Sequence, residues 1–249
     1  MRHVELQSSA SRREIAALEN ATATEIIEWA LARFGKRLCV TTSFTDTVLI
    51  HLATTVEPDM TVVFLDTGFH FPETLATMRE SMIRYQLRLR VARPESTRPG
   101  PVTNLWADGT TPCCDARKVR PLDNAMANGG FDAWLSGLRR TDSITRRDAR
   151  IVGIDRNGRT KINPIANWDD ETVAQYIADH DLVVNPLADQ GYDSVGCWPC
   201  TEPGAARTGR WTDETKTECG LHTAGVEVST SVPAFSISAL PSMKRVGQR

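Results

Sequence analysis

The feature that most constrains the fold is an alternation of short apolar runs with amphipathic segments. Apolar runs at 37–42, 61–68 and 87–94 have the length of buried strands, and the segments at 46–56 and 72–85 between them have helical periodicity. Strands that alternate with helices are typical of parallel sheets. The sequence therefore predicts an α/β fold with a mostly parallel sheet and helices on both faces.

Further segments extend the same pattern toward both ends. A helix is expected over 22–34, a fourth strand at 131–138, a strand-like segment at 161–165 and a helix over 167–180. Ligands of such sheets bind beyond the carboxyl ends of the strands. We therefore look for a binding site in the turns that follow the strands.

Composition and charge exclude several classes of function. The chain has 249 residues, of which 41% are hydrophobic, enough for one α/β domain with appendages. Its net charge of −2 gives no support for a general nucleic-acid-binding role. Charges interrupt the first residues where a secretory signal would need an apolar run, and no stretch has the length of a membrane span. We expect a cytoplasmic protein with neither nucleic acid nor membrane as partner.

Polar or small residues follow three of the expected strands. The turn Thr42–Thr47 offers hydroxyls and backbone N–H groups before a helix, which suits a phosphate, although many such turns only cap helices. Leu65–Gly68 follows the second strand, and Gly137–Arg140 follows the fourth. Three more arginines come soon after, although charge runs often only face solvent: Arg146, Arg147 and Arg150. Together these turns predict a shared site for a polyanion.

The six cysteines have an uneven spacing. Cys113 and Cys114 are adjacent, and Cys197 and Cys200 form a CxxC pair. In a reducing compartment such patterns indicate metal binding or catalysis more often than disulfides. The other two cysteines are Cys39, which the apolar run around it marks as a buried strand residue, and Cys219, which stands apart.

The adjacent pair constrains the kind of metal. Thr111 can cap a helix with Pro112 at its first position, which would place Cys113 and Cys114 in the first turn. Paired zinc ligands usually have at least two residues between them, whereas the four ligands of an iron–sulfur cube attach to four corners. The spacing favours a cube, with zinc and unrelated thiols as the alternatives.

Several motifs together resemble one family. LDTGFHFPET, CCDARKVRPL, GLRR, GCWPC and ECGLH follow one another in this order between about residues 38 and 222. They are similar to assimilatory adenylylsulfate reductases, the iron–sulfur branch of the adenylylsulfate and phosphoadenylylsulfate reductase family. This resemblance implies a fold like that of the adenine nucleotide α-hydrolases, which are related to PP-loop enzymes. It also implies one 4Fe-4S cluster per chain, on Cys113, Cys114, Cys197 and Cys200.

The resemblance also implies an activity. Such enzymes reduce adenylylsulfate to sulfite and AMP in assimilatory sulfate reduction, through a cysteine S-sulfonate. It makes Cys219 the nucleophile, and thioredoxin or a similar thiol carrier the reductant. The chain has no room for a thioredoxin-like domain, so the carrier would be a separate protein. His222 could lower the pKa of Cys219 or contact the substrate, or it could be an ordinary surface histidine.

Substrate contacts are implied position by position. Lys118 lies one helical turn past Cys114 and would link the cluster electrostatically to the substrate. Ser43 and Phe44 stand where ATP-cleaving relatives have glycines, and we expect their bulk to leave less room for a triphosphate. The full set of implied contacts is Thr42, Ser43, Leu65, Lys118, Gly137, Arg146, Arg207, Arg210 and His222.

The expected organisation has three parts. Residues 1–205 form a single nucleotide-binding reductase domain with the iron–sulfur site, 206–222 a mobile catalytic segment, and 223–249 a disordered tail rich in Ser, Thr and Pro. The sequence leaves open whether the chain forms a homo-oligomer.

Three other functions are weighed. Phosphoadenylylsulfate is an alternative substrate, although enzymes that use it usually lack the cysteine quartet. An ATP-dependent adenylating or thiolating ligase with a zinc site is disfavoured by the missing loop glycines and by ECGLH. A non-enzymatic iron–sulfur or zinc redox sensor would need no buried nucleotide site.

Overall fold

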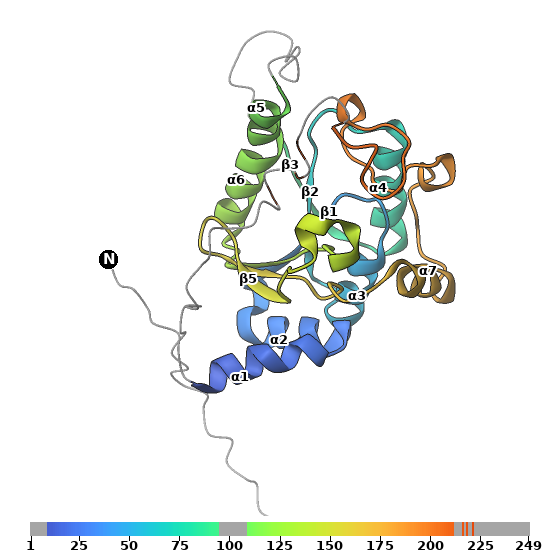
Figure 1. Ribbon diagram of the computed structural model, residues 1–249. Helices are drawn as coiled ribbons and strands as arrows, with labels where there is room; N and C mark the ends of the chain where they lie inside the picture. Colours follow the sequence, from blue (N-terminus) through green and yellow to red (C-terminus); the bar gives the residue numbers. More distant parts are fainter. Residues whose placement is uncertain (1–8, 95–108, 212–215, 217, 219–220, 222–249) are drawn as a thin grey trace, which may run out of the picture.

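The centre of the molecule is a mostly parallel sheet (Figure 1). The computed structural model describes residues 9–94, 109–211, 216, 218 and 221. In this part of the chain six strands lie in the order β3-β2-β1-β4-β6-β5, and only the edge strand β5 runs antiparallel to its neighbour. The strands are β1 (Leu38–Thr42), β2 (Thr61–Leu65), β3 (Arg88–Ala92), β4 (Ala133–Leu135), β5 (Val152–Ile154) and β6 (Thr160–Ile162).

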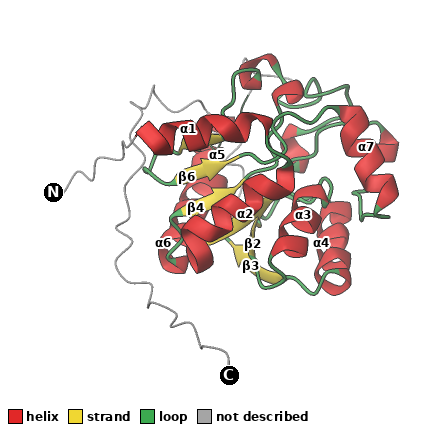
Figure 2. Ribbon diagram, turned by 90° about the horizontal axis from the view of Figure 1, so that it is seen from below, coloured by secondary structure: helices red, strands yellow, loops and turns green. Residues whose placement is uncertain are grey.

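Helices cover both faces of this sheet, as expected. Residues of α1, α2, α3, α4 and α7 pack on one face, where α2 lies across the strands (Figure 2). On the other face α6 packs against the sheet. A π-helical turn, Asp115–Val119, joins α5 to the start of α6. The helices are α1 (Ser9–Ala17), α2 (Ala23–Phe34), α3 (Val48–Val56), α4 (Pro72–Arg84), α5 (Thr110–Cys114), α6 (Arg120–Gly129) and α7 (Asp170–Asp179).

Alternation along the strands divides the core in two. Leu38 and Val40 of β1 point into the larger cluster under α2 and α3, whereas Cys39 between them points into the smaller cluster under α6. Successive strand residues face opposite sides of a sheet, so a strand covered on both faces must be apolar at nearly every position. Cys39 has no exposed surface, which confirms it as a buried strand residue.

Local sequence signals explain where two helices begin. Thr22 caps α2, accepting a hydrogen bond from the Glu25 amide at 3.2 Å, while the Glu25 carboxylate accepts one from the Thr22 amide at 2.7 Å. α4 starts at Pro72, as expected. α5 starts at Thr110, after Gly109, so Pro112 is not its first residue as predicted.

The strand order creates the place for a ligand. From β1 the chain moves outward through β2 to β3, and then returns to the other side of β1 with β4. The connections therefore diverge beyond the carboxyl ends of β1 and β4, which is the position where open α/β sheets bind ligands.

Phe44 in the β1–α3 turn provides a test of the core. Its side chain has no exposed surface and contacts Phe64 edge to face, with ring centroids 5.2 Å apart. We expect Phe44→Ala to lower the free energy of unfolding by about 3–5 kcal/mol, because it leaves a cavity in the larger cluster. Urea denaturation measures this. Ile83→Ala, at a side chain that is 75% exposed, is the control and should change little; equal losses in both variants would contradict this packing.

Candidate active site

The carboxyl ends of β1, β2 and β4 open into one cavity of about 750 Å³. This volume is typical of sites for small organic ligands. The β1–α3 turn contributes Thr42 and Ser43, β2 contributes Leu65, and the segment after β4 contributes Gly137. The three strand ends that the sequence singled out therefore meet at one cavity, which we call the switch-point cavity.

Cations from distant segments complete its wall. Of the nine expected substrate contacts, all eight within the described residues line the switch-point cavity: Thr42, Ser43, Leu65, Lys118, Gly137, Arg146, Arg207 and Arg210. The ninth, His222, lies outside the described residues, as does Cys219. What part these residues take in binding stays a prediction.

The β1–α3 turn is shaped by its own hydroxyls. The Phe44 amide donates to Thr42 Oγ1 at 3.1 Å, and the hydroxyls of Ser43 and Thr45 are 3.2 Å apart. Residues of the first turn of α3 also line the cavity. The N-terminus of a helix carries partial positive charge, so this end of the cavity favours an anion.

The expectation about Phe44 is wrong. Its backbone has a φ of +54°, and this turns the side chain into the core instead of the cavity. Phe44 therefore does not narrow the space for phosphates, and of the two residues at the glycine positions only Ser43 lines the cavity.

The four cysteines of the two pairs line a second, small cavity. Cys113 and Cys114 reach it from α5, Cys200 reaches it from the end of the short helical turn Trp198–Cys200, and Cys197 from the position just before that turn. The π-helical turn after α5 adds Arg117 and Lys118 to the same wall. Local π-helical geometry is often found at functional sites. The folded chain thus brings together two cysteine pairs that are far apart in the sequence.

The turn after β2 holds the second pair in place. The Trp198 amide donates to the Phe69 carbonyl at 2.8 Å, and Thr67 Oγ1 lies 3.3 Å from Cys197 Sγ. This turn serves both cavities, because Leu65, Thr67 and His70 line the switch-point cavity while Phe69 lines the cysteine cavity.

Arg117 connects this turn to the first pair. Its guanidinium donates to the Thr67 carbonyl at 2.7 Å and lies 4.0 Å from the centroid of the Phe69 ring. Gly68 has a φ of +75°, and a Cβ there would lie 3.4 Å from the Arg117 guanidinium. The left-handed backbone conformation is therefore what favours a glycine here, since a Cβ would meet Arg117 only at ordinary van der Waals distance.

The chemistry of these thiols suits a metal centre. Burial, reinforced by the charges of Cys197 and Cys114, raises the pKa of the Cys200 thiol to about 11. Burial and the charge of Cys114 also raise the pKa of Cys113. Bound metal removes such protons and offsets the repulsion between thiolates. Among the described residues, however, no three His, Cys, Asp or Glu side chains form a group that could hold a metal ion.

Among the described cations of the site, Lys118 is the one that lines both cavities. Its positive charge partly offsets the rise in the pKa of Cys113 and of Cys200, which burial and the neighbouring cysteines cause. Lys118 therefore lies between the two cavities, and its expected role of linking a cluster to a ligand stays a prediction.

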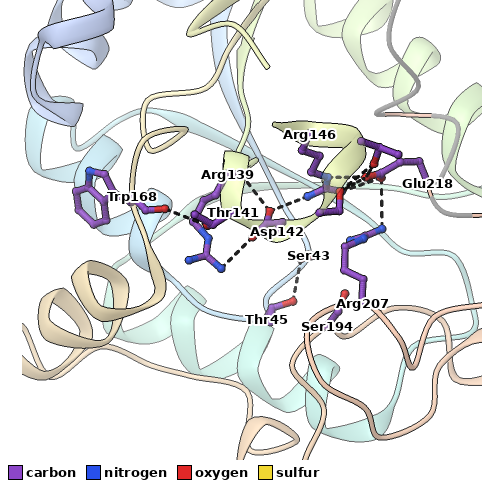
Figure 3. A network of polar contacts seen from close by, with 12 residues as sticks. Ser43, Thr45, Arg139, Thr141, Asp142, Arg146, Trp168, Ser194, Arg207 and Glu218 are labelled. Atoms are coloured by element: carbon purple, nitrogen blue, oxygen red, sulfur yellow. Dashed lines mark hydrogen bonds and ion pairs between the residues drawn. The ribbon is translucent and has the colours of Figure 1, made fainter. Parts of the chain in front are cut away.

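Arg146 is held by two carboxylates (Figure 3). Its Nε and Nη2 donate to the two oxygens of Glu218 at 2.7 and 2.9 Å, and its Nη1 donates to Asp142 at 2.8 Å. Arg207 Nη2 lies 3.3 Å from the same Glu218 carboxylate. Burial alone would raise the pKa of Glu218, but its hydrogen bonds with Arg146 and the charges of both arginines bring it below its ordinary value.

The other arginines of this region differ in role. Arg139 lines the cavity and pairs with Asp142 at 2.9 Å. Arg140 instead pairs with Glu19 at 2.8 Å and donates to the Ala149 carbonyl, which ties loops together. Arg147 and Arg150 are exposed.

Some residues of the site were not singled out from the sequence, among them Arg117 and Glu218. Arg117 and Glu218 each stand next to a residue that was, namely Lys118 and Cys219. Adjacency in the sequence was the available signal, but it does not say which side chain turns inward. Only the fold brings Arg117 to Phe69 and Glu218 to Arg146.

Comparison with known proteins identifies the family. The phosphoadenosine phosphosulfate reductase domain matches residues 37–203. The chain is 46% identical over 217 residues to adenosine 5'-phosphosulfate reductase of Streptomyces coelicolor, a match that covers 82% of this chain and 90% of the relative. It is 42% identical over 221 residues to the protein of the same name from Mycobacteroides abscessus, covering 85% and 92%.

Solved structures agree on the fold. The phosphate complex of phosphoadenylyl-sulfate reductase from Candida auris has a TM-score of 0.70 at 27% identity, over 81% of this chain and all of that one. Candida glabrata FMN adenylyltransferase has a TM-score of 0.58 at 13% identity, over 78% and 67%, which shows likeness of fold alone. The domain match and the close relatives confirm the family that the cysteine motifs indicated: the chain belongs to the phosphoadenosine phosphosulfate reductase family.

Proposed function

We propose that this protein reduces adenylylsulfate to sulfite and AMP in assimilatory sulfate reduction. The observation that carries the proposal is the place of Lys118, in the common wall of a nucleotide-sized cavity and a cavity lined by four cysteines. The names of the relatives at 42–46% identity support the same substrate.

The switch-point cavity offers a place for each part of the substrate. Leu65 and Gly137 line its β2 and β4 sides, where the nucleoside would lie. The phosphosulfate would lie toward Thr42, Ser43 and the N-terminal end of α3. The cations proposed to offset its charge are Lys118, Arg146, Arg207 and Arg210.

The four paired cysteines would hold one 4Fe-4S cluster. The ligands of a cube each bind a different iron, so they surround a cavity instead of meeting at one point, and Cys113, Cys114, Cys197 and Cys200 share such a cavity. When bound, the cluster would supply a compact centre of charge beside the Lys118 ammonium. Lys118 would then orient the substrate without any electron transfer from the cluster.

Sulfonate transfer would use Cys219 as nucleophile. Its thiolate attacks the sulfur of adenylylsulfate, the bond from that sulfur to the phosphate oxygen breaks, and AMP leaves with the electron pair. The product on the protein is a cysteine S-sulfonate. A thiolate of a dithiol carrier such as thioredoxin then attacks the Cys219 sulfur, expels sulfite and forms a mixed disulfide with Cys219. The second carrier thiol attacks this bond, closes the carrier disulfide and releases Cys219 as a thiolate. The carrier thus supplies both electrons. His222 would assist Cys219 or contact the substrate.

A cytoplasmic location belongs to the proposal. The five cysteines within the described residues are free thiols, which suits a reducing compartment. None of the helices in the described part of the chain is long and apolar enough to cross a bilayer.

Phosphoadenylylsulfate is the alternative substrate, because the Candida auris neighbour carries that name. Comparing kcat/KM for the two sulfonucleotides distinguishes them. We expect adenylylsulfate to be preferred, and a higher value for the 3'-phosphorylated compound would favour the alternative.

The first prediction concerns the nucleophile. Cys219→Ser should abolish sulfite formation, because a serine hydroxyl does not form the attacking anion near neutral pH. Mass spectrometry of wild type mixed with adenylylsulfate, without any carrier, should find one sulfonate adduct on Cys219. An adduct on another side chain, or none, contradicts the mechanism.

The second prediction concerns Lys118. Lys118→Ala should slow adduct formation in a single turnover by about 10²–10³-fold, since a preorganised cation next to the transferred group is lost. Iron and labile sulfide per chain should equal those of wild type. Lys36→Ala, at an exposed lysine of another segment, is the control. An unchanged single-turnover rate would remove Lys118 from the site.

The third prediction concerns Arg210. A Cβ on Gly196 would overlap the Arg210 guanidinium, which is the movable end of a long side chain. Gly196→Ala should therefore fold but displace Arg210 and weaken AMP binding about tenfold. Gly153→Ala, where a Cβ meets nothing within 4 Å, serves as control. Calorimetric titration with AMP measures both, and equal affinities would show that Arg210 takes no part.

A further inference from the structure

Glu218 is an acidic residue buried among the groups expected to bind an anion. It is 9% exposed, and each of its carboxylate oxygens accepts a hydrogen bond from Arg146. Arg207 Nη2 at 3.3 Å and Thr145 Oγ1 at 3.2 Å also donate to it (Figure 3). A two-point arginine pair of this kind fixes orientation as well as distance.

The arginine that holds Glu218 is itself held from behind. Arg146 binds Asp142 at 2.8 Å, Asp142 binds Arg139 at 2.9 Å, and Arg139 binds Asp170 in the first turn of α7 at 2.7 Å. All four residues of this row of alternating charges line the switch-point cavity. Figure 3 shows Arg139, Asp142 and Arg146 side by side. Arg146 is therefore a buried cation with a carboxylate partner on either side.

A second contact lies three residues further along the chain. Leu221 lines the switch-point cavity and packs against the smaller core cluster under α6. Glu218, one residue before Cys219 in the sequence, is thus bound to two arginines that line the cavity, and Leu221, two residues after Cys219, lines the cavity itself.

We propose that Glu218 is the positioning residue of the nucleophile, with Arg146 as its main anchor. Consecutive Cα atoms are about 3.8 Å apart, so fixing the Glu218 carboxylate restricts where the next residue can present its thiol. The inference depends on the proposed function, in which Cys219 attacks the substrate. It adds that Arg146 serves catalysis through Glu218, with Lys118 and Arg210 left as the cations nearer to the reacting sulfonate.

In the competing interpretation, Glu218 occupies the place of the substrate anion on Arg146, as a stand-in, and leaves it when the substrate binds. That exchange would detach the residue before Cys219 at the moment when the thiol is needed. The two interpretations differ in what loss of the charge does, because a positioning residue changes the rate of transfer and a stand-in changes the affinity for the anion.

Glu218→Gln is the decisive variant, because it keeps the shape and removes the charge. In single turnovers with adenylylsulfate, formation of the Cys219 adduct should slow about 10–100-fold, as expected for a misplaced reacting group. The dissociation constant of AMP should change less than about twofold. Alkylation of Cys219 by iodoacetamide should become faster. Glu202→Gln, at an exposed glutamate of a neighbouring segment, should match wild type in all three measurements.

Conservative variants keep the test decisive if Glu218→Gln folds poorly. Glu218→Asp keeps the charge but shortens the reach, and Arg146→Lys keeps the charge but loses the two-point contact. Both should slow adduct formation by intermediate amounts, and Glu218→Asp should preserve AMP affinity. Tighter AMP binding with an unchanged transfer rate in any of these variants would overturn the proposal in favour of a substrate stand-in. Unchanged rate and affinity would overturn it outright. Absence of any Cys219 adduct in wild type would instead refute the proposed function itself.

Discussion

The site depends on the position of β1 between β2 and β4. Parallel pairing on both sides of β1 brings three carboxyl ends to one edge of the sheet, and the reversal of strand order leaves space beyond them. That pairing requires a strand that is apolar on both faces, which Leu38, Cys39 and Val40 provide. Each further component of the site is a segment packed against this edge.

Much of this architecture could be predicted from local patterns. The parallel sheet and the helices that became α2, α3, α4 and α7 follow from apolar periodicity and from caps such as Thr22. β5 was missed because three residues at an antiparallel edge carry too little pattern, and α6 because only a narrow stripe of it faces the sheet. The start of α5 and the direction of Phe44 depend on backbone conformations at Gly109 and at Phe44 itself that residue type alone does not specify.

The candidate site divides in the same way. The cysteine pairs and the small or polar strand ends were visible as motifs, because their chemistry is unusual for structural residues. The partners of Arg146 could not be predicted from the sequence. Glu218 is 72 residues away, and several acidic residues nearer in the sequence would have been equally plausible partners for an ion pair. Long-range pairing of ordinary charges is set by the fold, and so the family resemblance could name Arg146 without saying what it binds.

The turn Asp66–Phe71 has a consequence for how damage would spread through the molecule. This short segment lines both cavities: Thr67 and His70 line the switch-point cavity, and Phe69 lines the cysteine cavity. Oxidation of Cys197, whose Sγ lies 3.3 Å from Thr67 Oγ1, would therefore also distort the wall of the switch-point cavity, even if no residue of that wall had reacted. Damage at the cysteine cavity would thus be measurable as weaker ligand binding in the other cavity.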